Sequence, residues 1–192
     1  AISKMGKAVG IASAAYFGAK GLISAFSTVI EASGRQEQAE KALEVALGKT
    51  STALLDQASA LQSVTTAGDE ALIEQQAFLA SLKFTEDQIK TIIPVALDLS
   101  AATGISLESA VRNTSKTFSG LAGELGELVP QLRDLTTEEM KAGEAVKVLG
   151  ELFEGQATKQ ADTMSGALIR AENSAGDLAE AIGEKLSPLV KA

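Results

Sequence analysis

Three pairs of acidic residues have a spacing that suits general acid–base chemistry or the binding of a divalent metal ion. They are Glu86 with Asp87, Glu124 with Glu127, and Glu138 with Glu139. Each pair lies at an expected helix start or on a polar helix face, where carboxylates favour the positive end of the helix dipole. No base and no pocket motif accompanies them. We therefore interpret the pairs as structural, and we predict no catalytic residue and no metal site.

Several residue types that commonly carry enzyme chemistry are absent from the sequence. The 192 residues include no His and no Cys. Without imidazole or thiolate, Ser-His and Cys-His nucleophilic arrangements, soft metal sites and disulfides are all excluded. The Gly-rich stretch SGLAGELG (119–126) lacks the Lys-Ser/Thr ending of a phosphate-binding loop, and its neighbourhood is acidic. We therefore expect neither an enzyme nor a cofactor.

Charge is distributed unevenly along the chain, whose net charge is -8. Lys4, Lys7 and Lys20 are the only charged residues before Glu31, so residues 1–30 carry +3 and the remainder carries -11. Direct binding of nucleic acid requires clustered Lys and Arg on the surface that faces the phosphates. An acidic body without a basic stripe therefore predicts no specific nucleic-acid binding.

The longest apolar run is AVGIASAAYFGAKGLISAFSTVI, residues 8–30, and Lys20 alone interrupts it. The run is long enough to span a bilayer, since about 20 apolar residues suffice. It also fits a buried, small-residue helix of a bundle, and a signal peptide is a third interpretation, although Lys20 would fall inside its apolar region. For the membrane interpretation, the residues that we expect to contribute are Gly10, Tyr16, Phe17, Gly18, Lys20, Gly21 and Phe26.

The fold class follows from the periodicity of the rest of the chain. From Glu31 onward, apolar residues recur at helical spacing, and no segment shows the sustained alternation of a strand. On the helix expected after Asp69, Leu82 is predicted to lie on the buried side. The predicted core residues of the helix expected after Thr85 are Ile89, Ile92, Ile93, Ala96, Leu97 and Leu99. We predict an all-α fold of several amphipathic helices with Gly and Pro breaks. These helices would form either an elongated helical bundle or extended helices in a homo-oligomer. The sequence divides into a hydrophobic N-terminal helix (1–48), helical hairpins (49–155) and a C-terminal helix (156–192).

Capping residues predict where these helices begin. Thr85 with Gln88 and Thr136 with Glu139 match the capping box, in which the two residues satisfy each other's free backbone N–H groups. Further starts are expected at Thr50 or Ser51, at Asp69 and at Ser106, with the last segment beginning near Gln156.

Glycine and proline predict where the helices end or break. Helix ends are expected at Gly48, Gly68, Gly104, Gly120 and Gly155. Pro94 should break its helix near Ile92, because proline removes a backbone hydrogen bond. Ser187-Pro188 should end the last helix, because the residue before proline disfavours helical geometry. Gly166 is interpreted as a hinge between two helical pieces.

The last segment carries a heptad-like stripe. Leu168, Ala175, Ile182 and Leu189 are seven residues apart, as expected for one line of a coiled-coil seam. The same stripe is also compatible with a face that packs on a local core. The predicted contact residues of a helix-packing or oligomer seam are Leu168, Ala171, Ala175, Gly176, Leu178, Ile182, Gly183 and Leu189.

Two stretches resemble the tape measure proteins of tailed bacteriophages and prophages. LDLSAATGISLESAVRNTSKTFSG (97–120) is similar to that family's Ala-rich helix, Thr-Gly turn and short capped helix. LFEGQATKQADTMSGALIRAENSAGDLAEAIGEKLSPL (152–189) resembles its ordered Thr-x-x-Gly, Asn-x-x-x-Asp-Leu and Ile-Gly-x-x-Leu-x-Pro-Leu steps. The resemblance covers about residues 70–190 of the printed sequence, and the first 48 residues match only in character.

The resemblance implies a structural, non-enzymatic role inside the phage tail. Family members set the length of the tail tube during assembly in the host cytoplasm, and they leave the tube at infection to assist DNA delivery. The implied partners are further copies of the chain, tail-tube and tail-tip proteins, a tail assembly chaperone and the host inner membrane. The alternatives are a membrane-active or pore-forming protein acting through residues 8–30, and a soluble helical adaptor domain.

Overall fold

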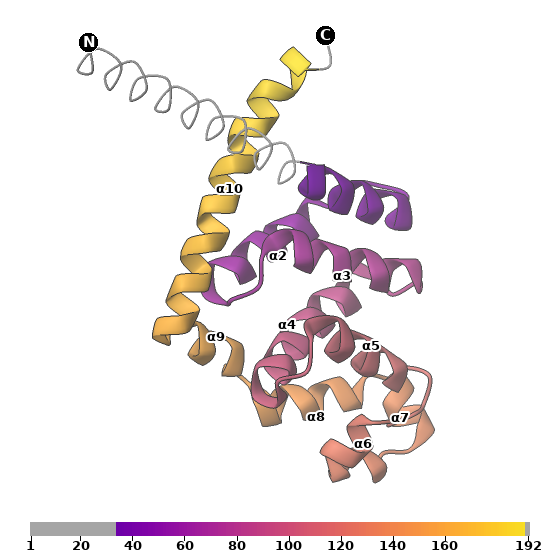
Figure 1. Cartoon of the computed structure of the whole chain (residues 1–192). Coiled ribbons are helices and arrows are strands. Elements are labelled where there is room, and N and C mark those ends of the chain that lie inside the picture. Colours follow the sequence, from indigo (N-terminus) through magenta and orange to yellow (C-terminus); the bar gives the residue numbers. More distant parts are fainter. Residues whose placement is uncertain (1–33, 191–192) are drawn as a thin grey trace, which may run out of the picture. The chain divides into compact units, whose positions relative to one another are not determined.

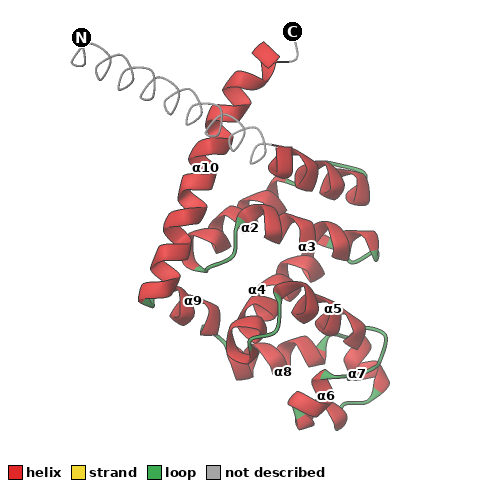
Figure 2. Cartoon of the chain, in the orientation of Figure 1, coloured by secondary structure: helices red, strands yellow, loops and turns green. Residues whose placement is uncertain are grey.

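The computed structural model describes residues 34–190, and every regular element in that part of the chain is helical (Figures 1 and 2). The all-α prediction is therefore confirmed. A helix over residues 34–47 comes first. The elements that follow are α2 (Thr52–Val64), α3 (Asp69–Ser81), α4 (Glu86–Thr103), α5 (Leu107–Thr117), α6 (Leu125–Leu128), the 3-10 turn η1 (Pro130–Arg133), α7 (Thr137–Lys141), α8 (Glu144–Phe153), α9 (Gln156–Ala161) and α10 (Met164–Val190).

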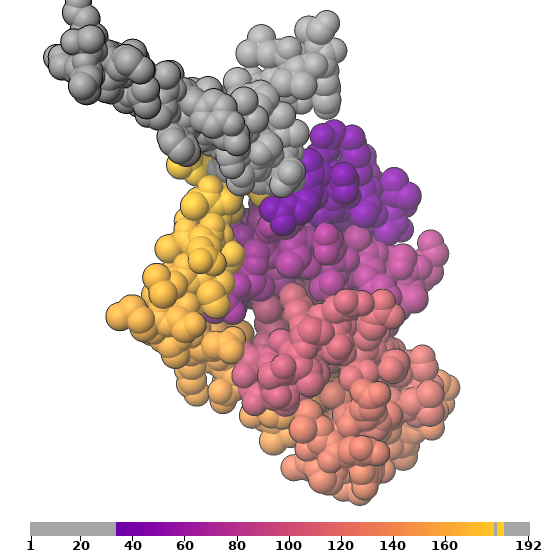
Figure 3. Space-filling model, in the orientation of Figure 1, coloured from indigo at the N-terminus to yellow at the C-terminus, as the bar shows by residue number. Residues whose placement is uncertain are grey.

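Residues 38–173 form one compact unit, while residues 34–37 and 174–190 belong to a second. The buried core lies in the first unit, and the space-filling view shows one outer face of that unit (Figure 3). The predicted divisions of the chain near residues 48 and 155 stay predictions.

Helix α4 is the centre of the compact unit, because it packs against α2, α3, α5, α8 and α9 (Figure 1). Its six predicted core residues are all buried, and Ile89, Ile92, Ile93 and Leu99 are fully inaccessible. Each such side chain contributes about 1.5–3 kcal/mol when it leaves water. The apolar pattern of α4 therefore explains why it occupies the core.

The predicted break of α4 at Pro94 is wrong, since the helix runs without interruption from Glu86 to Thr103. Ile92 and Ile93 before the proline and Leu97 after it are all buried. The burial of these three side chains, worth about 1.5–3 kcal/mol each, outweighs the cost of about 3 kcal/mol that a proline carries inside a helix. Proline therefore stays inside a helix whose apolar face is held by its neighbours.

The carbonyl group that Pro94 leaves without its helical partner is that of Lys90, and a side chain from another helix binds it. Gln57 of α2 donates its Nε2 to the Lys90 carbonyl at 2.8 Å. Gln76 of α3 donates to Gln57 Oε1 at 3.3 Å and to the Leu54 carbonyl at 2.9 Å. Two glutamines thus join α2, α3 and α4 through a part-buried chain of hydrogen bonds.

The predicted capping boxes are confirmed. Thr85 Oγ1 accepts from the Gln88 N–H at 3.3 Å, and Gln88 Oε1 accepts from the Thr85 N–H at 2.9 Å. Thr136 and Glu139 form the same pair at the start of α7. Ser51 caps α2.

Other predicted boundaries hold as well. Ser106 caps α5, and the helices before Gly48 and Gly104 end at those glycines, whose φ values are 72° and 75°. The left-handed region that both adopt is readily open to glycine.

The predicted α2–α3 connection is off by a few residues. Helix α2 ends at Val64 rather than Gly68, because the Thr65 hydroxyl binds the Leu61 carbonyl at 2.8 Å and turns the chain. Gly68 is then the N-cap of α3, and Asp69 is its first residue. Leu82, predicted on the buried side, lies beyond the helix and is 51% exposed.

Three other helix ends also differ from prediction. Helix α5 ends at Thr117, three residues before Gly120. The helix expected after Thr136 is divided into α7 and α8, because Gly143 adopts a φ of 92°. Helix α10 continues past Ser187-Pro188 to Val190. Pro188 lies in the last turn, so its ring removes only the hydrogen bond to residue 184 and interrupts no later turn.

Candidate functional site

The acidic pair at the start of α4 takes part in local structure. Glu86 forms an ion pair with Lys49 and accepts a hydrogen bond from Ser51 Oγ at 3.1 Å. The hydrogen bonds from Lys49 and Ser51 lower the pKa of Glu86 below its ordinary value of 4.5. The carboxylate thereby connects the loop before α2 to the first turn of α4.

The other two pairs are placed in a similar way. Glu139 accepts from both the Thr136 hydroxyl and the Thr136 N–H at 2.7 Å, and these hydrogen bonds lower its pKa. Glu138 pairs with Lys141 at 3.2 Å. Glu124, the N-cap residue of α6, accepts from the Asn113 side-chain amide at 3.1 Å. Each of these carboxylates thus has a local partner at or near a helix start.

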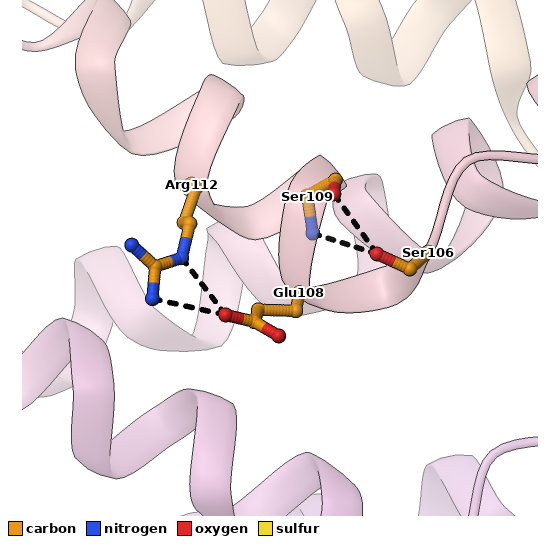
Figure 4. A network of polar contacts seen from close by, with 4 residues as sticks. All are labelled: Ser106, Glu108, Ser109 and Arg112. Carbon is orange, nitrogen blue, oxygen red and sulfur yellow. Dashed lines mark hydrogen bonds and ion pairs between the residues drawn. The ribbon is translucent and has the colours of Figure 1, made fainter.

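Arg112 on α5 makes an ion pair and covers an aromatic ring. Its Nη2 and Nε lie 2.9 and 3.0 Å from Glu108 Oε1, one turn earlier (Figure 4). Its guanidinium carbon lies 5.0 Å from the ring centre of Phe78, within the range of a cation–π contact. Ser106 and Ser109 complete the cap of the same turn (Figure 4). The network stabilises the start of α5 and fixes it against α3.

The predicted seam lies on one continuous helix. All eight seam residues fall within α10, so the heptad positions share one face. Leu168 and Leu178 are 62% and 64% exposed, and Ile182 is 44% exposed. Ala171 and Ala175 are exposed as well, whereas Gly176 is half-buried; Gly183 and Leu189 are placed only as members of the helix. What this face contacts stays a prediction.

The Thr-x-x-Gly step marks a tight junction between α9 and α10. Thr163 Oγ1 accepts from the Gly166 N–H at 3.0 Å and so caps the first turn of α10. A Cβ on Gly166 would lie 2.6 Å from the Cα of Ala161, which leaves no room for a side chain. The break expected at Gly166 therefore falls at residues 162–163, and the glycine permits the close packing of the two helices.

The candidate membrane residues Gly10, Tyr16, Phe17, Gly18, Lys20, Gly21 and Phe26 lie outside the described residues. Within residues 34–190, no helix combines the length and the apolar character that crossing a bilayer requires.

One cavity was not predicted from the sequence. A recess of about 460 Å³ lies where the ends of α3 and α5 meet the start of α4 and the end of α7. Three lysines, Lys83, Lys116 and Lys141, line it from separate elements. The rings of Phe84 and Phe118 also line it, edge to face with centroids 5.0 Å apart. Its size falls within the range of small-ligand and side-chain pockets, about 300–1,000 Å³.

Lys83 has an unusual backbone in this recess. Its φ is 69°, and among the described residues it is the one non-glycine residue with a positive φ. Its N–H binds the Ala80 carbonyl at 2.9 Å, and the next N–H binds the Leu79 carbonyl at 3.2 Å. This is the Schellman ending of a helix, at the position that glycine usually takes. A lysine there carries a conformational cost.

A second missed feature is the cap of α9. The N-cap residue of α9 is Gly155, which has no side chain to cap the helix. Asp98 of α4 accepts from the N–H groups of Gly155 and Ala157 at 3.1 and 2.9 Å. No local sequence pattern signals a cap that is supplied by a residue 57 positions earlier in the chain. In the sequence, the one sign of this cap is an acidic residue, Asp98, among the apolar residues of α4.

Comparison with protein-family models, with curated proteins and with solved structures finds no match to this chain. Function is therefore argued from the residues and the geometry described above.

Proposed function

We propose that this chain is a structural, non-enzymatic segment of a phage or prophage tail tape measure protein. The proposal is supported by the ordered motifs over residues 152–189 and by their placement on α9 and α10. In this role the protein sets tail-tube length and is released at infection to assist DNA delivery. Its partners would be further copies, the tail-tube and tail-tip proteins, the assembly chaperone and the host inner membrane, and it would occupy the tail lumen or tip.

The exposed heptad face of α10 carries the proposal. Leu168 and Leu178 are almost two-thirds exposed on a helix whose spacing is that of a coiled-coil seam. Each leucine would gain about 1.5–3 kcal/mol when buried. Several copies packed along this face would bury it, as assembly inside a narrow tube requires.

The compact unit bears on where this segment lies along a tape measure protein. Residues 38–173 fold back on themselves, whereas a length-setting chain must be extended. If these 136 residues formed one straight helix, they would span about 204 Å at 1.5 Å per residue. We therefore place the folded unit at an end of the tape and α10 at its junction with the extended part.

Two in-frame deletions in the parent gene test the role and this placement together. Removing residues 38–173 should shorten tails, measured by electron microscopy, by much less than about 204 Å. Removing an equal number of residues from an extended helical part of the same gene should shorten them by nearly that amount. Unchanged tail length after both deletions would contradict the tape-measure role, and equal shortening would contradict the placement.

Self-association through α10 is tested on the purified chain. The double variant Leu168→Ser/Leu178→Ser should shift the protein toward the monomer in sedimentation velocity runs. A matched control changes two exposed apolar residues elsewhere, Val45→Ser/Leu152→Ser. A monomeric starting protein, or an equal loss of association in the control, would count against the seam.

A membrane-active protein is the second candidate, favoured by the apolar run at residues 8–30. Leakage of dye-loaded vesicles is then expected from the full chain and not from a chain that lacks residues 1–34. Equal leakage from both chains, or none from either, would remove this candidate.

A further inference from the structure

We propose that the three-lysine recess binds an acidic peptide segment of a partner protein, with one apolar side chain in the cavity and carboxylates on the lysines. The recess is defined by Lys83, Lys116, Lys141, Phe84 and Phe118. This inference does not depend on the tape-measure function, since it rests on the cavity alone.

The charge of the recess is opposite to that of its surroundings. Residues 31–192 carry a net charge of -11, yet three lysines from three elements line one cavity. An acidic segment is repelled by most of this surface and attracted at the recess, so electrostatics selects the site as well as the partner. We commit to carboxylates carried by a peptide, because an apolar side chain of the same peptide can cover the aromatic surface that the cavity also offers.

The lysines retain capacity for a ligand. Lys116 donates to Asn113 Oδ1 at 3.1 Å, and Lys141 pairs with Glu138, which is itself largely exposed. Each ammonium has three donors, so both keep donors for a carboxylate. Lys83 makes no ion pair or hydrogen bond through its side chain with the described residues. It is the lysine most available to a partner.

The apolar part of the recess suits one large side chain. Phe84 and Phe118 contribute aromatic surface, and Leu82 lies beside them with half of its surface exposed. Ser115, Ser119 and Gln88 add polar groups at the wall, where a peptide backbone requires hydrogen-bond partners. An aromatic residue between two glutamates combines the features that the cavity accommodates.

The backbone conformation of Lys83 is a second observation in favour of a binding site at the recess. A lysine in the left-handed conformation persists although glycine would fit without strain. Lysines near helix carboxyl ends also offset the helix dipole, and this accounts for Lys116 and Lys141 in the last turns of α5 and α7. The helix dipole does not account for Lys83, whose strained backbone lies just beyond the end of α3. Such outliers gather at binding sites.

The same strain provides a variant that keeps the fold. Lys83→Gly removes the ammonium and relieves the backbone, so its thermal unfolding midpoint should equal or exceed that of the original protein. Lys83→Arg retains the charge. Lys159→Ala, an exposed lysine of α9 outside the recess, is the matched control.

Binding is measured by NMR titration of the full chain with N-acetyl-Glu-Phe-Glu-amide. Peaks of residues 82–84, 115–119 and 141 should shift, and Lys83→Gly should weaken binding about tenfold, the effect of about 1.4 kcal/mol from one charged contact. Lys83→Arg and Lys159→Ala should bind within about twofold of the original protein. The Gln-Phe-Gln peptide should bind far more weakly, and so should the Glu-Ala-Glu peptide.

Three results would overturn the proposal. Unchanged affinity in Lys83→Gly would remove the recess as the site. Equal or tighter binding of free 3-phenylpropionate would assign the recess to small organic acids. Loss of self-association in Lys83→Gly would identify the occupant as a second copy of the chain rather than a separate partner.

Discussion

Helices α4 and α10 are both long and apolar on one side, and each contains a proline, yet they occupy opposite environments. Every predicted core residue of α4 is buried, and helices α2, α3, α5, α8 and α9 pack against it. The apolar residues of α10 include Leu168 and Leu178, which are mostly exposed. Periodicity alone therefore identifies an apolar face, but it does not say whether that face is covered by the same chain or by another.

The largest expected difference in stability comes from comparing one truncated side chain in α4 with one in α10. Ile93→Ala in α4 should lower the free energy of unfolding by about 2–5 kcal/mol, because it leaves a cavity in a closed core. Leu168→Ala in α10 should change it by less than about 0.5 kcal/mol at concentrations where the chain is monomeric. Urea unfolding followed by circular dichroism measures both, and similar losses would show that α10 is covered within the chain.

A glycine pair within α10 sharpens the contrast. Gly166→Ala should destabilise the protein by about 1–3 kcal/mol, because the new methyl group would meet the backbone of Ala161. Gly176→Ala meets no atom within 4 Å, so the gain in helix propensity should stabilise by up to about 1 kcal/mol. The same unfolding experiment distinguishes the signs. In the assembled state Gly176→Ala should instead weaken association, if another backbone approaches there.

The cap that α4 supplies to α9 gives a smaller effect. Asp98→Ala should cost about 0.5–2 kcal/mol, because two N–H groups at the start of α9 lose their acceptor. Asp56→Ala on the exposed side of α2 is the control and should change stability by less than about 0.5 kcal/mol. Equal effects of the two variants would show that the cap contributes nothing specific.

The smallest expected effect concerns pH. The pKa of Glu86 is lowered in the folded state, so its contribution is complete above the ordinary value of 4.5 and is lost as the pH falls through the lower, folded value. Glu86→Gln should therefore be less stable than the original protein at pH 7 and nearly equal to it at the acid end. Unfolding free energies at several pH values measure this, and a constant difference would contradict it.

Features encoded by neighbouring residues were predicted well. The capping boxes at Thr85 and Thr136 and the helix end at Gly104 depend on a few adjacent residues, and all three are confirmed. The six core positions of α4 follow from helical periodicity. Local chemistry alone decides the caps and the helix end, and periodicity decides which face of α4 is apolar.

Features that depend on distant residues were missed or placed wrongly. Pro94 stays within α4 because Gln57 and the buried isoleucines compensate for it, and no local pattern shows this. The recess joins Lys83, Lys116 and Lys141, which lie far apart in the chain. The one sign of the recess in the sequence is Lys83 itself, a lysine at a helix end where glycine is usual.

The glutamine chain at Pro94 also bears on how the molecule opens. The Lys90 carbonyl is satisfied only while α2 is in place, and the Gln57 amide is positioned in part by Gln76 of α3. Opening any one of the three helices leaves a part-buried polar group of another helix without its partner. Amide protons of α2, α3 and α4 should therefore exchange with solvent deuterium at closely similar rates, as a single opening unit.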